Sequence, residues 1–511
     1  MWRRIHLVLI LVRLYFALSP SYLHPDENFQ GPEVIAGEVF SYPVHHTWEF
    51  TDKYPIRSTF PLWLIYGLPM IILRSIWVGV GKGEPSPAVV YWTLRVLMFT
   101  LSFVLEDWAL EELIGTSWRR RRIALLLVAS SYVTWTYQTH TFSNAIETLV
   151  VLWSLYLVMR IVADKQHSGS FACAVLAFIL VTGIFNRITF PAYVIVPGLR
   201  LIPHFRRKPL AFASLVFFGS LTACTAVYFD TVFYHPEATF FDFLTSPVIT
   251  PLNNVLYNVS RSNLQKHGLH PLYQHFLVNL PLLIGPAFLL LPCLIYNRLR
   301  SSGGDTASRI DSAFCGTLLL SIFPHQEARF LIPAVPLLLS SMRLPRRFRQ
   351  AWIVVWIIFN VIMGMLMGVF HQGGVVPMQL HLGKQDGIQH AFWWKTYSPP
   401  IWLLNGKNEE IVTTDLMGIP GDEMLATLRG NTDCYRDDGV YLVAPGSATF
   451  LDPYINASNR SEISLEEKWR FNRHLNLDDL DFGEDGVWPT LARVLGRRGL
   501  VLWRVERRCE A

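Results

Sequence analysis

Residues 350–370 read QAWIVVWIIFNVIMGMLMGVF, and this stretch decides the class of fold. It contains no charged side chain. A helix of about 20 apolar residues is long enough to cross the hydrocarbon core of a bilayer, which is about 30 Å thick. The stretch therefore predicts a transmembrane helix and favours a helical membrane protein over a soluble one.

Similar apolar runs occupy most of residues 1–370. Apolar residues make up 51% of the chain, charged residues make up 16%, and the mean hydropathy is +0.30. In a soluble domain, about a quarter of the residues are charged. This composition excludes a nucleic-acid-binding protein, a disordered chain and a secreted disulfide scaffold. We expect an α-helical polytopic membrane protein with about 11–12 spans. The expected spans lie near 5–19, 60–80, 88–110, 122–140, 141–163, 169–186, 188–203, 210–234, 276–296, 312–324, 329–342 and 350–370.

Short loops rich in Arg and Lys indicate the cytosolic side of a membrane protein. Such loops lie near residues 3–4, 119–122, 206–208, 298–309 and 343–349. The loops 20–59, 236–275 and 324–328 and the tail 371–511 then face the lumen. If both 60–80 and 88–110 crossed the membrane, Arg119–Arg122 would lie on the lumenal side, which conflicts with the preference of basic loops for the cytosol. We therefore expect one of those two segments to be re-entrant or interfacial.

The tail has the composition of a soluble domain. Residues 371–511 carry 15 basic and 20 acidic side chains, a net charge of −5, whereas residues 1–370 carry 29 and 19. Apolar runs at Gly439–Ala444 and Leu500–Val505 predict strands, and Glu462–His474 is expected to form a helix. We expect a small mixed lumenal domain, in which Cys434 and Cys509 are permitted to form a disulfide.

Three Asn-x-Ser sequons lie in the expected lumenal parts. They are typical acceptors of N-linked glycan, although such tripeptides also arise by chance. The three asparagines are Asn258, Asn456 and Asn459.

The first lumenal loop begins with His24-Pro25-Asp26-Glu27-Asn28, directly after the first span. An Asp at the membrane surface can take a proton from a sugar hydroxyl as that oxygen attacks an anomeric carbon, which is general-base catalysis. The alternative is an interfacial helix cap, with Asp26 capping the helix and Glu27 favouring its dipole. Both interpretations fit the spacing.

The same loop continues with Trp48, Glu49 and Arg57. A Trp beside charged side chains is typical of a surface that stacks on a sugar and hydrogen-bonds it. A Trp near a membrane is as often only an interfacial anchor.

A second polar segment, Pro324-His325-Gln326-Glu327-Ala328-Arg329-Phe330, lies between two very apolar runs. Ionisable residues in a lumenal turn between two membrane spans are costly, and they imply a partner or a ligand. Arg329 offers a planar fork that suits a phosphate, and His325 can also donate. The alternative is an internal Glu327–Arg329 pair that closes a helical hairpin.

Two further segments are weaker candidates. Arg187, at another lumenal span junction, could neutralise a second phosphate oxygen, or it could simply extend its charged end to the interface. The run His474–Asp481 contains carboxylates at a spacing that can hold calcium, but a solvated acidic turn is the favoured interpretation. The chain has no phosphate loop, no dinucleotide fingerprint and no nucleophile elbow.

The His-Pro-Asp-Glu at 24–27 and the His-x-Glu-x-Arg-Phe at 325–330 carry a resemblance to a known family. The chain resembles the multi-spanning mannosyltransferases of glycosyltransferase family 22, which have the C-type membrane fold. Further stretches resemble the fungal members that act in assembly of the glycosylphosphatidylinositol (GPI) anchor, and the similarity covers essentially the whole chain. These stretches are Pro55–Ser58, Gly368–Val375, Lys395–Pro400 and His474–Asp481.

The resemblance implies an endoplasmic reticulum membrane enzyme with a lumenal active site. Its donor is then dolichyl-phosphate mannose, and its acceptor is the GPI precursor glycolipid, whose third mannose receives an α-1,2-linked fourth mannose. Alternatives are a related enzyme that acts on the lipid-linked N-glycan or on an earlier GPI intermediate and, more distantly, a lipid or solute transporter.

The roles of the candidate residues follow as expectations. Asp26 is the expected base, with Glu27 orienting the loop or binding the sugar. Arg329, His325 and Arg187 are expected to hold the donor phosphate. The sugars are expected to lie against His24, Trp48, Glu49, Arg57 and Glu327. We expect no required metal, because Arg and His supply positive charge, although the acidic run could hold one. Asp26 and Arg329 are expected to meet around one lipid-borne sugar.

Overall fold

The structure is a computed structural model that describes residues 2–115, 117–237, 239–266, 268–300, 305–434, 439–455, 462–480 and 486–507. The chain groups into two compact units. Unit 1 comprises Met1–Ala17, His46–Leu68 and Leu94–Ile362, and unit 2 comprises Leu18–His45, Pro69–Thr93 and Met363–Ala511. Each unit is described separately below.

Helices dominate the first 370 residues. The α-helices there are α1 (Trp2–Ala17), α2 (Asp26–Phe29), α3 (Pro32–Phe40), α4 (Trp48–Thr51), α5 (Phe60–Leu62), α6 (Leu68–Gly79), α7 (Pro87–Leu101), α8 (Asp107–Ile114), α9 (Trp118–Ala129), α10 (Tyr132–Trp135), α11 (Ser143–Ala163), α12 (Ser170–Asn186), α13 (Pro191–Gly198), α14 (Ile202–Arg207), α15 (Pro209–Tyr234), α16 (Phe240–Thr245), α17 (Thr250–Val259), α18 (Arg261–Gln265), α19 (Leu280–Ile284), α20 (Leu291–Arg300), α21 (Asp305–Ser321), α22 (Ala334–Ser341) and α23 (Arg349–Met365). Short 3-10 or π segments join them at η1 (Trp63–Gly67), η2 (Ser102–Glu106), η3 (Tyr137–Thr139), η4 (Leu199–Leu201), η5 (His275–Asn279), η6 (Gly285–Leu290), η7 (Ala328–Leu331) and η8 (Leu366–Phe370).

Six helical stretches of the described residues are long and apolar enough to cross a membrane. They are Phe60–Gly79, Pro87–Ile114, Ser143–Ala163, Pro209–Tyr234, His275–Arg300 and Arg349–Phe370. The prediction of a polytopic helical membrane protein is therefore confirmed. The other expected spans correspond to shorter helices, so the count of 11–12 stays a prediction.

Neither segment within 60–110 contains a re-entrant turn, so only the interfacial half of that expectation stays a prediction. Phe60–Gly79 and Pro87–Ile114 are continuous helical stretches of 20 and 28 residues, whereas a re-entrant segment turns back before it has crossed. Both stretches are long enough to span the hydrocarbon core. An interfacial placement of either one stays open.

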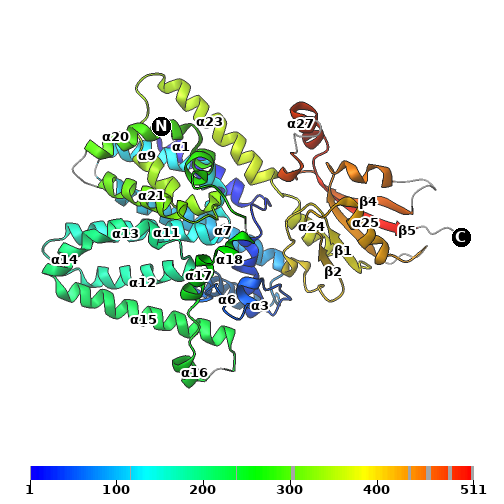
Figure 1. Cartoon of the computed structure of the whole chain (residues 1–511), viewed down its shortest axis with the longest axis horizontal. Helices are drawn as coiled ribbons and strands as arrows, with labels where there is room; N and C mark the ends of the chain where they lie inside the picture. Colours follow the sequence, from blue (N-terminus) through cyan, green and yellow to red (C-terminus); the bar gives the residue numbers. More distant parts are fainter. Residues whose placement is uncertain are drawn as a thin grey trace. The chain divides into compact units, whose positions relative to one another are not determined.

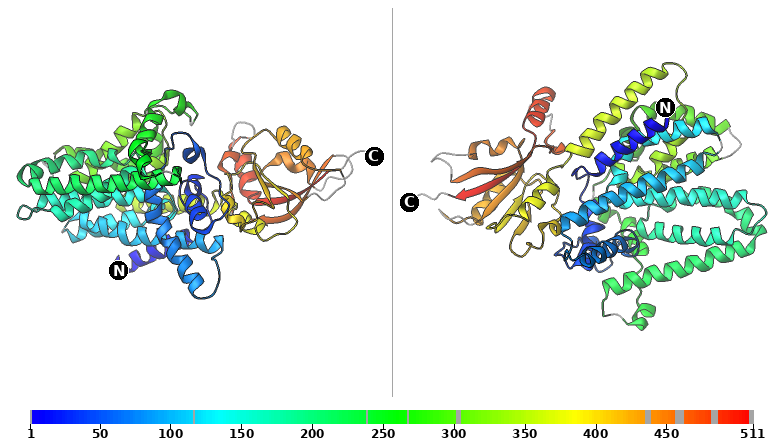
Figure 2. Two further views of the ribbon diagram at one scale, coloured as in Figure 1. Left: turned by 90° about the horizontal axis from the view of Figure 1, so that it is seen from below. Right: turned by 180° about the vertical axis from the view of Figure 1, so that it is seen from behind.

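Unit 1 is a layered helical bundle. Helix α12 packs against α11 on one side and α15 on the other, while α13 packs against α21. Figure 1 shows α11, α12 and α15 running side by side, and the right-hand view of Figure 2 shows them from behind. Over its most apolar 18 residues, α11 is 67% buried in the protein and α15 only 11%, so α11 is the more central of the two helices.

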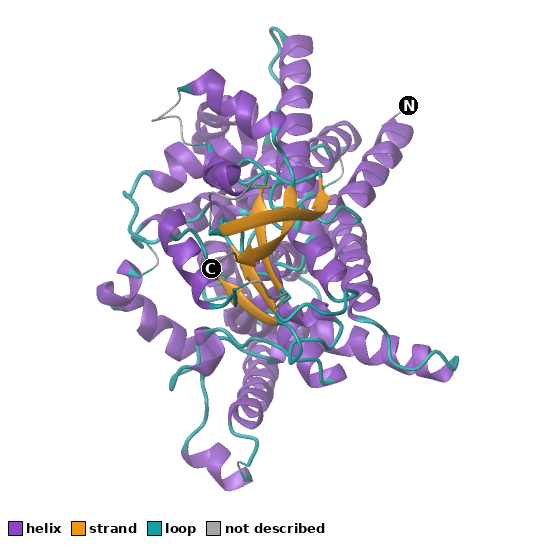
Figure 3. Ribbon diagram, turned by 90° about the vertical axis from the view of Figure 1, so that its right-hand side faces the viewer, coloured by secondary structure: helices purple, strands orange, loops and turns teal. Residues whose placement is uncertain are grey.

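Unit 2 contains a five-stranded sheet in the order β2-β1-β3-β5-β4, drawn in orange in Figure 3. The strands are β1 (His390–Trp393), β2 (Val412–Asp415), β3 (Val440–Pro445), β4 (Ile463–Phe471) and β5 (Leu500–Arg507). Strand β1 is parallel to β2 and β3, with Phe392 opposite Thr414 and Leu442. Strand β5 is antiparallel to β3 and β4. The helices from residue 371 onward are α24 (Val375–Leu382), η9 (Ile401–Leu404), α25 (Gly421–Gly430), η10 (Thr449–Tyr454), η11 (Leu477–Asp479) and α27 (Val487–Gly496).

The sheet is covered on both faces, which explains why its inner strands are apolar at successive positions. Side chains alternate between the two faces of a strand. In β5, Val501 and Trp503 pack on the side of α25, whereas Leu500 and Leu502 pack on the side of α24. Tyr22, from the first loop, is 0% exposed within the core on the α24 side.

The strands expected at Gly439–Ala444 and Leu500–Val505 are confirmed as β3 and β5. The helix expected over Glu462–His474 is wrong, because this segment forms β4. Ile463 and Leu465 are buried there at alternate positions, and β4 pairs antiparallel with β5. Pairing with the remaining edge of β5 outweighs the helix propensity of the Glu and Lys residues that follow.

Cys434 is disulfide-bonded, and Cys509 lies outside the described residues. Asn258 lies in α17, where its side-chain amide donates to the carbonyl oxygen of Asn254 at 2.9 Å. Asn456 and Asn459 lie outside the described residues.

Candidate active site

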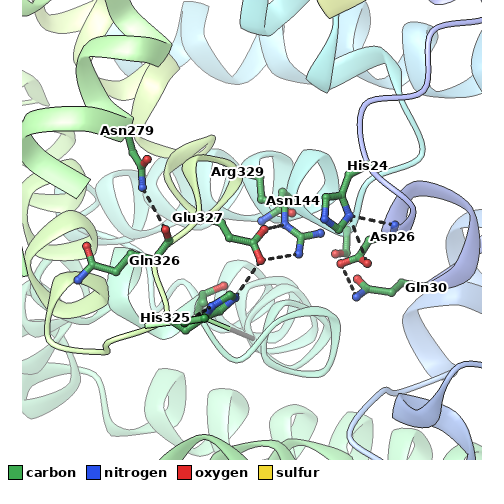
Figure 4. Close-up of polar contacts among 12 residues, drawn as sticks. His24, Asp26, Gln30, Asn144, Asn279, His325, Gln326, Glu327 and Arg329 are labelled. Atoms are coloured by element: carbon green, nitrogen blue, oxygen red, sulfur yellow. Dashed lines mark hydrogen bonds and ion pairs between the residues drawn. The ribbon is translucent and has the colours of Figure 1, made fainter. Parts of the chain in front are cut away.

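In unit 1, the turn at Pro324–Phe330 gathers two cations, His325 and Arg329, around the carboxylate of Glu327. Glu327 Oε1 lies 2.8 Å from His325 Nε2, and Arg329 donates to Glu327 through both Nε and Nη2, the latter at 3.1 Å. Figure 4 shows Glu327 between the two cations. The Glu327–Arg329 pair, which was the alternative interpretation of this segment, is therefore present, and His325 also contacts Glu327.

Residues around the turn fix its backbone. Gln326 is 1% exposed and donates to the carbonyl oxygens of Ser321 and Phe323, while its own side-chain oxygen accepts from the backbone N–H of His275 at 3.0 Å. Its backbone N–H donates to His270 Nδ1 at 3.3 Å. Because buried polar groups need partners, this network holds the turn in one conformation.

Glu327 also controls the charge of His325. Burial disfavours the charged imidazole, but the hydrogen bond and the negative charge of Glu327 outweigh burial, so the pKa of His325 is raised above its ordinary value. His325 is therefore a second positive charge beside Arg329 over a wider pH range than a free histidine.

Phe330 connects this turn to Arg187. The guanidinium carbon of Arg187 lies 5.3 Å from the centre of the Phe330 ring, and that of Arg329 lies 5.7 Å from it. Such distances are typical of cation–π contacts. Two cations expected from separate parts of the sequence thus share one aromatic ring.

The sequence interpretation missed Glu147, the partner of Arg187. Glu147 is 0% exposed, its Oε2 lies 3.3 Å from Arg187 Nε, and its Oε1 accepts from the Thr189 hydroxyl at 2.5 Å. Ser143 accepts from Arg187 Nη1 at 2.8 Å. A lone carboxylate inside an apolar span was the available signal, since such a residue is costly without a partner.

The second half of the first loop also lies in unit 1. Arg57 donates to Glu49 Oε1 through Nε at 3.1 Å and Nη2 at 2.9 Å, and the ring of Trp48 lies 4.8 Å from that of Tyr257. Trp48, 39% exposed, therefore presents an aromatic surface beside an ion pair, an arrangement that suits a sugar.

The first half of that loop lies in unit 2. Gln30 donates to Asp26 Oδ2 at 2.5 Å, and the backbone N–H of Asp26 donates to His24 Nδ1 at 3.2 Å, as Figure 4 shows. The carboxyl of Asp26 is 20% exposed, whereas Glu27 is 1% exposed. The carboxyl of Asp26 is thus partly accessible to solvent, whereas that of Glu27 is enclosed by protein.

The capping alternative for Asp26 is not what the structure shows. Helix α2 has Pro25 at its N-cap, with no side-chain cap, and Asp26 is the first residue of the helix. The carboxyl of Asp26 instead accepts from Gln30 one turn later.

The C-terminal part of unit 2 holds the first loop in place. Tyr22 donates through its hydroxyl to the carbonyl oxygen of Ser398 and through its backbone N–H to that of His371. The rings of Tyr22, His24 and His371 lie 6.0, 6.1 and 5.4 Å from that of Tyr397. Gly368–Val375 and Lys395–Pro400 were notable in the sequence only for their similarity to family members. In the structure, both stretches pack around His24–Glu27.

The described part of the run His474–Asp481 is not the solvated acidic turn that the sequence favoured. His474, Asn476 and Asp479 are 1%, 2% and 5% exposed, and the Ser447 hydroxyl donates to Asp479. Asp481 lies outside the described residues. Among the residues that the structure describes, no cluster of three or more His, Cys, Asp or Glu side chains could hold a metal ion.

The expected site residues thus fall into separate groups. Unit 1 contains His325, Glu327, Arg329 and Arg187 around Phe330, and separately Trp48, Glu49 and Arg57. Unit 2 contains His24, Asp26 and Glu27. The meeting of Asp26 with Arg329 remains a prediction from the sequence.

Comparison with known proteins gives one consistent result. The model of the Alg9-like mannosyltransferase family matches residues 4–404. GPI mannosyltransferase 4 of Aspergillus oryzae is 52% identical over 99% of both chains, and that of Emericella nidulans is 50% identical over 99% of this chain and 98% of the other. The protein of that name from Saccharomyces cerevisiae is 35% identical over 93% and 94%.

A solved structure shares the fold. The crystal structure of ArnT from Cupriavidus metallidurans bound to undecaprenyl phosphate covers 98% of both chains, with a TM-score of 0.52 and 12% sequence identity. Similarity at this identity concerns the fold alone. It agrees with the expected C-type membrane fold, in which a multi-span helical region is joined to a small C-terminal sheet.

Proposed function

The chain belongs to the Alg9-like mannosyltransferase family, and from this premise we propose that it is a mannosyltransferase of GPI-anchor assembly. It takes mannose from dolichyl-phosphate mannose and adds a fourth, α-1,2-linked mannose to the third mannose of the GPI precursor. The reaction takes place on the lumenal side of the endoplasmic reticulum membrane. The observation that carries the proposal is the similarity over 99% of the chain, which includes the C-terminal sheet as well as the spans.

The donor phosphate binds Arg329 and His325, with Arg187 as a further cation. The geometry of unit 1 supports this assignment because both guanidinium groups lie against Phe330 and because Glu327 favours the charged form of His325. Charge-assisted hydrogen bonds to phosphate are among the strongest in proteins. They stabilise the phosphate as it leaves, so no separate general acid is needed.

Asp26 acts as the general base. Its carboxylate takes the proton of the acceptor 2-hydroxyl while that oxygen bonds to C1 of the donor mannose and the bond from C1 to the phosphate oxygen breaks. Dolichyl phosphate leaves with the electron pair of that bond. One displacement on a β-linked donor inverts the anomeric centre and gives the α-product. The partial exposure of Asp26 and its bond from Gln30 support this role.

The remaining side chains position the two substrates. Glu27 is buried and orients the α2 turn that carries Asp26. Trp48, Glu49 and Arg57 lie together and suit a sugar face. No step requires a metal ion, since Arg and His carry the positive charge. We expect turnover to continue in the presence of a chelator.

The direct test is incubation of the purified protein with labelled dolichyl-phosphate mannose and a trimannosyl GPI acceptor. We expect a four-mannose product that an α-1,2-specific mannosidase trims back to three. Parallel reactions contain the lipid-linked N-glycan precursor and an earlier GPI intermediate. Transfer to either of these in place of the trimannosyl acceptor rejects the proposed substrate, and no transfer to any acceptor rejects the enzymatic assignment.

A further inference from the structure

Unit 2 contains a cavity of about 370 Å³ beside the first loop. Small-molecule sites occupy about 300–1,000 Å³, so the cavity is large enough for one small ligand. Its polar lining includes Lys395, Thr396, Ser398, Asp415 and Asp479, and Pro25 is also part of its wall.

The fold places this cavity where sheet proteins commonly bind ligands. Strands β2, β1 and β3 are parallel neighbours. Lys395–Ser398 follow the carboxyl end of β1, Asp415–Gly418 lie at that of β2, and Ser447, just after β3, donates to Asp479. Ligands of open sheets with parallel strands bind in the crevice outside these carboxyl ends.

Two residues of the lining have an unfavourable backbone conformation. Lys395 has φ 53° and Met417 has φ 51°, a region that side-chain-bearing residues rarely adopt, and the backbone N–H of Lys395 donates to the carbonyl oxygen of Met417 at 2.7 Å. Such conformations persist where the surrounding structure enforces them, and they cluster at ligand sites. The two strained residues shape one wall of the cavity together.

Thr396, one of the lining residues, has a buried hydroxyl that has no partner among the described residues. Thr396 is 8% exposed, and its Oγ1 makes no hydrogen bond within the described part of the chain. Buried polar atoms are nearly always paired in proteins. Its oxygen is buried, so a ligand pairs with it only when the Thr396 side chain turns toward the cavity, and that pairing relieves the cost of the unpaired hydroxyl.

The charges of the lining select the chemical class of that ligand. Lys395 carries one positive charge, whereas Asp415 and Asp479 carry two negative charges, so the formal sum of −1 disfavours a phosphate. The hydroxyls of Thr396 and Ser398 and the amide of Asn476 complete a lining that suits many hydroxyl groups. A neutral sugar matches this lining.

We propose that the cavity binds a hexose of the acceptor glycan adjacent to the mannose that receives the new sugar. Pro25 lines the cavity and directly precedes Asp26, so the bound hexose holds the acceptor next to the proposed base. This inference rests on the proposed function for the identity of the glycan. It adds that the C-terminal sheet of unit 2 selects acceptors that carry more than the reacting sugar.

The test uses the full-length protein and two matched variants. Thr396→Val removes the unpaired hydroxyl and keeps the shape of the side chain. Thr413→Val is the control, because Thr413 Oγ1 also has no hydrogen-bond partner among the described residues, but Thr413 does not line the cavity. Loss of an unpaired hydroxyl should not lower the thermal unfolding midpoint of either variant.

Binding of a soluble methyl trimannoside is measured by calorimetric titration, independently of turnover. We expect Thr396→Val to weaken binding about three- to tenfold, the usual effect of one lost hydrogen bond, and Thr413→Val to leave it unchanged. In the transfer assay, Thr396→Val should raise KM for the trimannosyl acceptor by the same factor and leave KM for the donor unchanged.

The outcomes separate this inference from the proposed function. Trimannoside binding that depends on Thr396 without any mannose transfer supports the sugar site and rejects the enzyme assignment. Equal binding by both variants, or no trimannoside binding by the unmodified protein, overturns the sugar site even where transfer takes place.

Discussion

The Tyr22 hydroxyl donates a 3.0 Å hydrogen bond to the backbone carbonyl of Ser398, which lies 376 residues further along the chain. Tyr22 precedes His24–Glu27, and Ser398 lies in the segment that follows β1. The first loop of the chain is therefore anchored to the C-terminal sheet of unit 2, and variants on either side of this contact should affect the same function.

Tyr22→Phe tests this anchor. The variant removes the partly buried bond to Ser398, at a cost of about 0.5–1.5 kcal/mol, the usual contribution of one hydrogen bond. We expect a lower thermal unfolding midpoint and a lower kcat. Tyr54→Phe is the control, because Tyr54 is 63% exposed. Unchanged stability and turnover in Tyr22→Phe would show that the contact does not hold the loop.

Asp26→Asn tests the base. The amide keeps the shape of the side chain but cannot accept the proton, so turnover should fall about 10²–10⁴-fold, the usual contribution of general-base catalysis. The unfolding midpoint should change little, because the Asn carbonyl oxygen can still accept from Gln30. Asp386→Asn, at a side chain that is 96% exposed, serves as the control. Near-normal turnover by a folded Asp26→Asn protein contradicts the assignment.

Arg329→Lys tests the donor phosphate. Lysine keeps the positive charge but loses the planar fork that binds a phosphate through two N–H groups. KM for dolichyl-phosphate mannose should rise about tenfold, the equivalent of about 1.4 kcal/mol of lost binding. Arg74→Lys changes an exposed Arg–Glu84 pair in the same way and serves as the control. An unchanged dependence on donor concentration would remove Arg329 from the phosphate site.

Glu33→Gln tests a pH dependence of stability within unit 2. Burial raises the pKa of Glu33 from its ordinary 4.5 to about 8, although the backbone N–H groups of His45 and Trp402 oppose the shift. Between those pH values the folded protein binds a proton that the unfolded chain does not. The stability contributed by Glu33 therefore falls as the pH rises through this window.

The thermal unfolding midpoint is compared at about pH 5.5 and pH 8.5. The decrease toward high pH should be smaller in Glu33→Gln, because Gln resembles the neutral acid and does not titrate. Glu38→Gln, at an exposed position of the same helix α3, should keep the full decrease. Equal slopes in all three proteins would show that Glu33 is ionised in the folded state.

Gly373→Ala tests the packing that supports the first loop. A Cβ at this position would lie 2.4 Å from the carbonyl oxygens of Arg473 and Val369, both of them backbone atoms that cannot move away easily. We expect loss of folded protein on size-exclusion chromatography. Gly430→Ala, where a Cβ meets nothing within 4 Å, should remain folded. A stable Gly373→Ala protein would show that the backbone at Arg473 and Val369 can move away from the added Cβ.

The sequence predicted the strands β3 and β5 correctly because their apolar runs are covered on both faces of the sheet. It gave the wrong structure for β4. A run of Glu and Lys has helical propensity, but pairing with β5 lies outside any local window of sequence. It also missed Glu147, whose role depends on Arg187, 40 residues later, rather than on its own neighbours.

Local composition alone determined the class of fold and the candidate residues, because the length and polarity of a span and the presence of ionisable groups between spans are properties of short segments. Tertiary structure alone decided the neighbours of those residues. It placed Tyr397 against His24, Phe330 beneath two arginines and Thr396 in a cavity at the ends of parallel strands. The contacts of His24 with Tyr397 and of Arg187 with Phe330 join segments more than 100 residues apart, and they form only when packing brings those segments together.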